Sequence, residues 1–311
     1  MKNSRRSRAI IGFSIATILV ALPAFSVRSM QGLPGRLSPE VEKIAASAYD
    51  TNPFRELSHT MGGAQFKSHI YGGSNIRAIV LGDSHASSIV TAVQAALNEP
   101  EDGVLSMSYT SCPTLFGVQQ ERKDLHCSAF NEWAMSEISK LPAKVPVIIA
   151  NRSSAYLYGN KYGSHQFSPE IYFEEMSSKM DEASFMSEYS SYFVRSVCRI
   201  AKSRPVYLLR PLPEMPADVP REMARAVQLG RSVDITMSVN TYRIRNAAVW
   251  AIQNQASKAC GAHILDPLPA LCQNDACHGA YGNVPSYYDD NHLSEAGNRR
   301  LVPIFKRALL Q

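Results

Sequence analysis

Short apolar runs alternate with longer amphipathic segments along most of the chain. The apolar runs predict strands at 77–81, 104–108, 145–150, 206–209 and 263–265. The amphipathic segments predict helices at 86–98, 128–141, 183–202, 238–259 and 294–309. Strands that alternate with helices are typical of a parallel sheet with helices on both faces. We therefore expect an α/β fold, a three-layer α/β/α domain around a doubly wound, five-stranded parallel sheet.

The N-terminus follows a different pattern. An uncharged, mostly apolar stretch at 9–26 comes after four basic residues, Lys2, Arg5, Arg6 and Arg8. A positive start followed by an apolar run is typical of a signal peptide, and this run is almost long enough to span a membrane. We expect residues 1–30 to be a signal peptide or an uncleaved signal anchor, and we favour the anchor. In both cases the rest of the chain is exported.

Composition narrows the classes of function. The net charge is +5, but the four N-terminal basic residues account for most of it, so the remainder is close to neutral. No basic cluster interleaved with aromatic residues follows, which argues against a nucleic-acid partner. The sequence has no glycine-rich phosphate loop, so we expect no nucleotide cofactor.

Cysteine usage agrees with export. The chain has six cysteines, an even number, at Cys112, Cys127, Cys198, Cys260, Cys272 and Cys277. Two pairs, 112 with 127 and 272 with 277, would close short loops, which leaves 198 with 260 as a third bridge. This pairing is a hypothesis, because six cysteines allow many connectivities. No Cys-x-x-Cys occurs, so we expect no metal site.

The first candidate for chemistry is Gly82-Asp83-Ser84-His85, at the end of the first predicted strand. A strand-to-helix turn exposes the Ser84 hydroxyl and fixes its direction, as a serine nucleophile requires. The free N–H groups at the start of the following helix can stabilise an oxyanion. The tripeptide alone is weak evidence, because Gly, Asp and Ser are common in turns and N-caps.

The second candidate is Asp289-Asp290-Asn291-His292, near the C-terminus. His292 can act as the general base for Ser84, and Asp289 is spaced to reach its other ring nitrogen. Asp290 is adjacent and could compete for that role. The alternative for His292 is an ordinary surface-loop histidine. Together the two motifs predict an acyl-transfer enzyme with a Ser-His-Asp mechanism.

A long polar stretch at 152–180 is rich in Tyr, Ser and Gly. Long loops of this kind in compact domains often bind ligands. A surface excursion without a function explains the composition equally well.

The two motifs resemble the first and last blocks of the SGNH, or GDSL-like, hydrolase superfamily. The similarity is closer still to the SGNH domain fused to membrane acyltransferase-3 proteins such as O-acetylases. Further segments that resemble that family are Ser111-Cys112-Pro113, Cys127-Ser128-Ala129-Phe130-Asn131, Pro211-Leu212-Pro213-Glu214-Met215, Tyr242-Arg243 and the junction Gly32-Leu33-Pro34-Gly35-Arg36. The resemblance implies an SGNH hydrolase fold, which is flavodoxin-like. It divides the chain into 1–30, a connecting region at 31–75 and an SGNH catalytic domain at 76–311.

The chain departs from this pattern in two respects. The superfamily has a Gly-x-Asn-Asp block, whereas this sequence reads Ala150-Asn151-Arg152-Ser153. Asn151 is then the candidate oxyanion donor, Arg152 a charged substitute or substrate contact, and the backbone near Ser111 a second donor. The multi-helix acyltransferase domain is also absent from the sequence, so a separate integral membrane protein would supply the acyl group.

The resemblance implies an exported serine O-acyltransferase or esterase that acts on acyl groups, in our expectation acetyl groups, of a cell-envelope or secreted polysaccharide. Its expected location is periplasmic, anchored in the inner membrane by the N-terminal helix. Two alternatives remain: a plain carboxylesterase or lipase, and a carbohydrate-binding SGNH module without catalysis.

Overall fold

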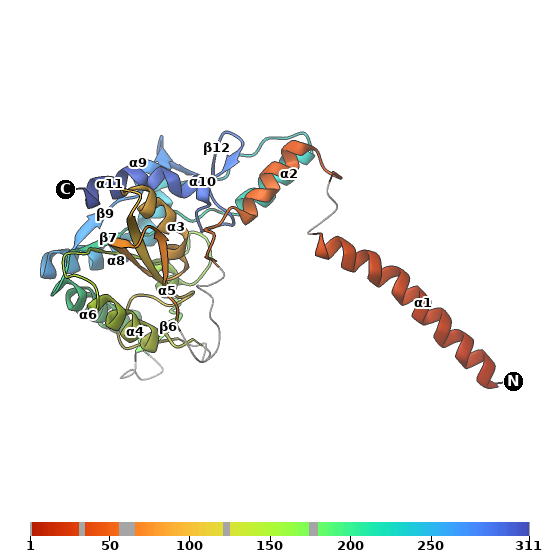
Figure 1. Ribbon diagram of the computed structural model, residues 1–311, viewed down its shortest axis with the longest axis horizontal. Coiled ribbons are helices and arrows are strands. Elements are labelled where there is room, and N and C mark those ends of the chain that lie inside the picture. The colour runs from red at the N-terminus through yellow and green to blue at the C-terminus, as the bar shows by residue number, and fades with distance from the viewer. Residues whose placement is uncertain (1, 31–34, 56–65, 121–124, 174–179, 311) are drawn as a thin grey trace.

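The computed structural model describes residues 2–30, 35–55, 66–120, 125–173 and 180–310. The N-terminal helix α1 (Lys2–Ser29) extends away from an α/β body that contains the sheet (Figure 1). Its stretch Ile10–Ser29 has a mean hydropathy of 2.3 and no buried residue. Within the described part of the chain, it is the one helix long and apolar enough to cross a membrane. A signal peptide and a signal anchor both fit this length and composition.

A six-stranded sheet forms the centre of the body, in the order β1-β3-β2-β5-β7-β9. The five predicted strands are confirmed and pair in parallel: β2 (Asn75–Gly82), β3 (Asp102–Ser108), β5 (Val147–Ala150), β7 (Val206–Leu209) and β9 (His263–Leu265). A sixth strand, β1 (His69–Gly72), pairs antiparallel with β3 at one edge. The sheet is therefore mixed, with one strand more than the sequence pattern predicts.

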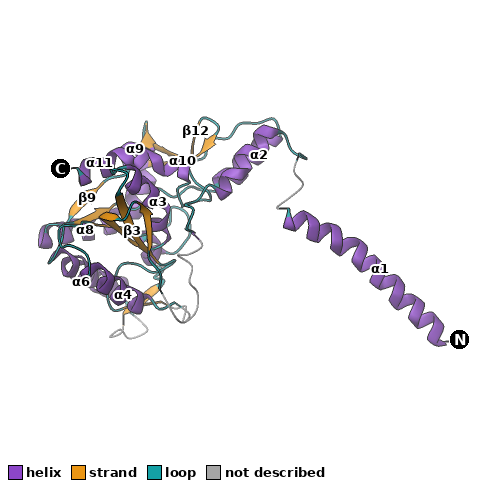
Figure 2. Cartoon of the chain, viewed as in Figure 1, coloured by secondary structure: helices purple, strands orange, loops and turns teal. Residues whose placement is uncertain are grey.

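Helices cover both faces of the sheet (Figure 2). Side chains of β2 alternate between two cores, with Ala78 and Val80 in one and Ile79 and Leu81 in the other. Helices α3 (Ser84–Ala95) and α11 (Val302–Leu309) pack in the first core. Helices α4 (Cys127–Ser139) and α6 (Glu182–Ala201) pack in the second, and α8 (Val239–Cys260) contributes to both. This arrangement confirms the three-layer α/β/α fold.

The remaining elements are short. The helices are α2 (Pro39–Ala46), α5 (Ser153–Tyr158), α7 (Val219–Gln228), α9 (Leu268–Leu271) and α10 (Glu295–Asn298), with 3-10 turns at Ser47–Tyr49 and Arg299–Leu301. The strands are β4 (Val118–Gln120), β6 (Ile171–Phe173), β8 (Thr236–Ser238), β10 (Cys272–Gln273), β11 (Ala276–His278), β12 (Ala280–Tyr281) and β13 (Val284–Pro285).

The helix predicted at 294–309 is not continuous. It is divided into α10, a 3-10 turn and α11. Pro303 lies in the first turn of α11, where a missing N–H costs nothing. The same proline cannot continue a helix that starts earlier, which accounts for the interruption.

The stretch 31–75, expected as a connecting region, contributes to the body. Val41 and Ile44 of α2 are buried in the first core, and α2 packs against α7. The stretch also supplies β1. Residues 31–34 and 56–65 lie outside the described part of the chain, and so does most of the junction motif at 32–36.

Three disulfides are formed, Cys112–Cys127, Cys198–Cys260 and Cys272–Cys277. Their sequence separations are 15, 62 and 5 residues. The bridge between Cys198 and Cys260 joins α6 to the end of α8. These pairs are the ones that the spacing of the cysteines favours.

Candidate active site

Ser84 is the first residue of α3, directly after the turn that ends β2. Gly82 makes this turn possible, because a Cβ there would lie 2.0 Å from the carbonyl oxygen of Ala150. Its φ of 155° is also unfavourable for any other residue. Asp83 is the N-cap of α3, and its Oδ1 accepts a 2.8 Å hydrogen bond from the N–H of His85. The backbone therefore fixes the direction of the Ser84 side chain.

The other oxygen of Asp83 joins α3 to α5. Oδ2 accepts hydrogen bonds of 2.7 Å from the N–H of Arg152 and from the Tyr156 hydroxyl. Asp83 is only 1% exposed, so these partners replace the water that a buried carboxylate loses. The start of α5, directly after β5, therefore holds the turn before Ser84 in place.

The fold brings Ser84, His292 and Asp289 together across more than two hundred residues of sequence. His292 Nε2 lies 2.7 Å from Ser84 Oγ, and His292 Nδ1 lies 2.7 Å from Asp289 Oδ2. Asp289 Oδ1 accepts hydrogen bonds of 2.8 Å from the N–H groups of Asn291 and His292. Asp290 instead accepts a hydrogen bond from the Asn291 side chain. The carboxylate that contacts the ring of His292 is therefore Asp289, the one that the spacing along the chain favours.

Asp289 is ionised at ordinary pH. Burial opposes its charge, but the hydrogen bond and positive charge of His292, with the two backbone N–H groups, outweigh burial and lower its pKa to about 2. An ionised Asp289 can accept a hydrogen bond from Nδ1–H of His292. In a neutral ring that carries its proton on Nδ1, Nε2 is the atom that can take the proton of the Ser84 hydroxyl.

Two aromatic side chains enclose the ring of His292. Tyr288 stacks on it with ring centroids 5.1 Å apart, and His85 meets it edge-on at 5.0 Å. Burial, followed by the charge of His292, lowers the pKa of His85 to about 4, so His85 is neutral at pH 7. His85 Nε2 lies 3.1 Å from Asn291 Oδ1, which links the start of α3 to the His292 loop. Sequence reasoning did not single out Asn291.

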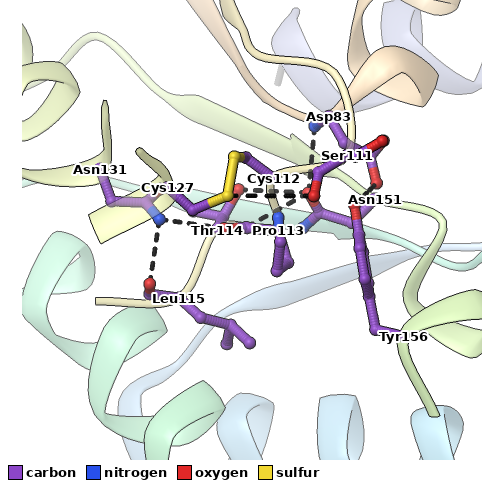
Figure 3. The surroundings of a disulfide bond; sticks show 10 residues. All are labelled: Asp83, Ser111, Cys112, Pro113, Thr114, Leu115, Cys127, Asn131, Asn151 and Tyr156. Carbon is purple, nitrogen blue, oxygen red and sulfur yellow. Dashed lines mark hydrogen bonds between the residues drawn. A yellow bond between two sulfur atoms is a disulfide. The ribbon is translucent and has the colours of Figure 1, made fainter. Parts of the chain in front are cut away.

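Asn151 is buried, and donors from two residues, Asp83 and Thr114, fix the orientation of its amide. Its Oδ1 accepts hydrogen bonds from the N–H of Asp83 at 3.2 Å and of Thr114 at 3.3 Å (Figure 3). The amide nitrogen must therefore point the other way. An amide N–H of this kind is a suitable oxyanion donor, and that role for Asn151 remains a prediction.

Ser111 precedes the Cys112–Cys127 disulfide, which Figure 3 shows beside it. Its φ of 62° is left-handed, uncommon for a residue other than glycine. The carbonyl oxygen of Ser111 lies 3.9 Å from Cys127 Sγ, and Asn131 donates to the carbonyl oxygens of Pro113 and Leu115. The disulfide and Asn131 together hold this loop in an unusual conformation.

Arg152 points toward Glu214 rather than toward the reacting atoms. Its Nε and Nη2 donate to the two carboxylate oxygens of Glu214 at 3.1 and 3.0 Å. Burial would raise the pKa of Glu214, but Arg152 and then Arg245 lower it overall. Neither Glu214 nor Arg245 was a candidate from the sequence, because only the fold brings them to Arg152.

A small cavity of about 160 Å³ opens beside Ser84 and His292. Ser111 and Arg152 also line it, whereas Asn151 and Asp289 are not among its described lining residues. Two larger cavities, of about 410 and 330 Å³, contain none of the predicted site residues. Among the residues with described positions, no group of three His, Cys, Asp or Glu side chains is arranged to hold a metal ion.

Comparison with known proteins gives one family match. The model of the family described as SGNH domain (fused to AT3 domains) matches residues 55–307. No match was found among curated proteins.

The solved structures that are similar to this chain include the following two. The periplasmic domain of a lipopolysaccharide acetyltransferase from Salmonella ser. Paratyphi A is 16% identical with a TM-score of 0.57, over 86% of this chain and 97% of that one. Est24, a carbohydrate acetylesterase from Sinorhizobium meliloti, is 14% identical with a TM-score of 0.44, over 76% of this chain and 99% of that one. At these identities the first likeness shows the fold.

Proposed function

The chain belongs to the family of SGNH domains fused to AT3 domains, which makes it an acyltransferase or ester hydrolase, and we propose that it acts on acetyl groups of a cell-envelope or secreted polysaccharide. Ser84, His292 and Asp289 carry the reaction in this proposal. The observation that supports it is the continuous chain of 2.7 Å contacts from Ser84 Oγ through the imidazole to Asp289.

The reaction starts when His292 Nε2 removes the proton of Ser84 as Oγ attacks the ester carbonyl carbon. The tetrahedral intermediate collapses when the carbon–oxygen bond to the leaving alcohol breaks, and His292 returns the proton to that alcohol. A sugar hydroxyl or water then attacks the acyl-Ser84 and gives its proton to His292. The bond between the acyl carbon and Ser84 Oγ then breaks, His292 returns its proton to Oγ, and the new ester or acid leaves. Asp289 keeps its hydrogen bond to Nδ1 throughout and stabilises the imidazolium.

The negative charge on the intermediate needs hydrogen-bond donors. The N–H groups at the start of α3, the amide of Asn151 and the backbone near Ser111 are the candidates in this proposal. The left-handed backbone of Ser111 supports its part, because strained backbone gathers at functional sites.

Export and membrane attachment complete the proposal. The apolar helix α1 and three disulfides support an extracytoplasmic location with α1 as the anchor. The family is named for domains fused to AT3 domains, which supports an integral membrane acyltransferase as the partner that supplies the acyl group.

Two alternatives are less well supported. A lipase needs an apolar acyl site, whereas the cavity beside Ser84 is small and Ala155 is the one described lining residue without a polar side-chain group. A carbohydrate-binding module has no need of the Ser84–His292 hydrogen bond. Transfer and hydrolysis differ only in which hydroxyl reaches the acyl-enzyme.

The test uses the full chain purified in detergent, with 4-nitrophenyl acetate and acetylated xylan as esters. We expect Ser84→Ala to abolish acetate release and labelling by a fluorophosphonate, since both need the activated hydroxyl. Ser139→Ala, at an exposed serine of α4, is the control and should retain both. Adding a glycan acceptor should divert acetyl groups from water to the glycan if the enzyme is a transferase. A folded wild type that neither labels nor releases acetate would leave the binding module as the better explanation.

A further inference from the structure

Glu214 is a buried carboxylate in the segment 210–218, which joins β7 to α7. It is 6% exposed, and two arginines, Arg152 and Arg245, balance its charge. It is not among the described residues that line the cavity beside Ser84, and the acyl chemistry gives it no part. A buried charge is costly unless its partners are fixed, so Glu214 and the two arginines hold one another in place.

On one side, Glu214 holds the turn before Ser84 through Arg152. Two guanidinium nitrogens of Arg152 donate to the two carboxylate oxygens of Glu214, at 3.1 and 3.0 Å. A bidentate contact of this kind fixes the orientation of the arginine side chain. The backbone N–H of the same arginine donates to Oδ2 of Asp83, the residue that caps α3 directly before Ser84. The position of Arg152 therefore bears on the position of the nucleophile.

On the other side, the same segment holds the loop of the His-Asp pair. The N–H of Met215 donates to the carbonyl oxygen of Asp290. The N–H of Val219, the first residue of α7, donates to the carbonyl oxygen of Asp289 at 3.2 Å. Met215 and Val219 are 1% and 0% exposed, and both pack in the first core. The carboxylate that contacts the histidine is thus attached to the segment that carries Glu214.

The two arginines differ in how far they can move. The side chain of Arg245 is 1% exposed and also donates to the carbonyl oxygens of Gly159 and Ser164. The side chain of Arg152 is 17% exposed and lines the cavity. Without a carboxylate between them the two guanidinium groups repel each other, and Arg152 is the one that can turn toward water.

We propose that Glu214 is a positioning residue, which sets the distance between Ser84 and His292. It acts through Arg152 on the serine side and through the backbone N–H groups of its own segment on the histidine side. The inference rests on acyl transfer at Ser84, as proposed above. Since Glu214 does not touch the acyl group, its loss slows the chemical step more than it weakens substrate binding.

The test uses the full chain purified in detergent. It measures kcat and KM on 4-nitrophenyl acetate, the rate of fluorophosphonate labelling, and the free energy of unfolding in urea. The variants are Glu214→Ala, Glu214→Gln, Arg152→Ala and the double variant of the two alanine substitutions.

Two controls separate positioning from a loss of stability or charge. Val197→Ala removes buried contacts of α6 in the second core. Glu132→Ala breaks another bidentate contact between a carboxylate and an arginine, the exposed pair with Arg199. Neither residue is among the described residues that line the cavity, so both variants should label within about threefold of the wild-type rate.

We expect Glu214→Ala to lower kcat and kcat/KM by the same factor, roughly 10- to 100-fold, as for a catalytic group displaced by about 1 Å. Labelling should slow by a similar factor. Glu214→Gln keeps an acceptor for Arg152 and should recover part of both rates, while staying at least threefold below the wild type. Arg152→Ala should also slow both rates. The double variant should be at most about threefold slower than the slower single variant, because both changes break one contact.

Three results would overturn the inference. The first is a Glu214→Ala variant that labels as fast as Val197→Ala. The second is a folded Glu214→Gln variant with wild-type rates, which decides the matter even where Glu214→Ala fails to fold. The third is a double variant in which the two single losses multiply, since Glu214 would then not act through Arg152. A wild type that neither cleaves 4-nitrophenyl acetate nor is labelled by fluorophosphonate refutes the proposed function instead.

Discussion

His85 makes stability depend on pH. Its pKa is about 4 in the folded protein, against 6.5 for an unperturbed histidine, so between these values the unfolded chain binds more protons. Stability should therefore fall as the pH drops from 6.5 to 4, by roughly 3 kcal/mol. Urea unfolding at pH 7.5 and 4.5 measures the difference.

His85→Gln supplies the comparison, because glutamine does not titrate. The variant should lose most of this pH dependence, although its stability at pH 7.5 is lower. Asp289 contributes in another window, since its stabilisation is lost only as the pH falls from 3.8 toward 2. An unchanged slope between pH 6.5 and 4 in His85→Gln would show that other groups cause it.

Single residues were predictable where local pattern and chemistry agree. Ser84 follows an apolar strand, and Asp289 precedes His292 by three residues, so the sequence pointed to all three residues that meet in the structure. The contact of His85 with Asn291 and the ion pairs of Glu214 join distant segments. No periodicity or spacing along a single chain reveals such pairs.

At the scale of elements, the segment before β1 contacts both halves of the candidate site. The backbone carbonyl oxygen of Asp50 accepts a hydrogen bond from the N–H of Glu295, and its side-chain Oδ2 accepts one from the N–H of Ala296. Both donors lie at the start of α10, shortly after the loop that carries His292. Asn52 donates to the carbonyl and hydroxyl oxygens of Ser87 in the first turn of α3. This segment therefore helps to set the distance between Ser84 and His292.

Asp50→Ala should lower stability by about 1 kcal/mol, as for the loss of a helix cap. It should also slow fluorophosphonate labelling of Ser84 more than the stability loss explains, because the His292 loop shifts. Asp50→Asn keeps an acceptor and should restore most of the rate. Ser38→Ala removes the cap of α2 and is the control. If Asp50→Ala and Ser38→Ala label at the same rate, the contact affects stability alone.

Elements with strong patterns were predicted, and those that depend on tertiary contacts were not. Each of the five parallel strands contains a short apolar run, such as Ala78–Leu81 in β2 and Val147–Ala150 in β5, as expected for strands buried on both faces. Strand β1 is only four residues long, with one buried side chain, so it carries no pattern of its own. Pairing with β3 makes it a strand.

For the molecule as a whole, the three disulfides differ in the length of chain they close. The chain-entropy relation gives about 4 kcal/mol for the bridge of Cys198 with Cys260, about 3 for Cys112 with Cys127 and about 2 for Cys272 with Cys277. Double alanine variants of each pair should lose stability in that order, measured by urea unfolding. A loss that is largest for Cys272 and Cys277 would mean that native packing, rather than chain entropy, decides the effect.

The short connection after α1 limits how far the active site can reach. Residues 30–38 join α1 to α2, and a chain of that length spans at most roughly 30 Å when fully extended. With α1 in a membrane, the body stays within that height of the bilayer. Under the proposed function, an enzyme held at this height would meet a cell-envelope glycan by lateral diffusion over a surface, so the density of acceptors at that surface, and not their concentration in the compartment, would set how often it acts.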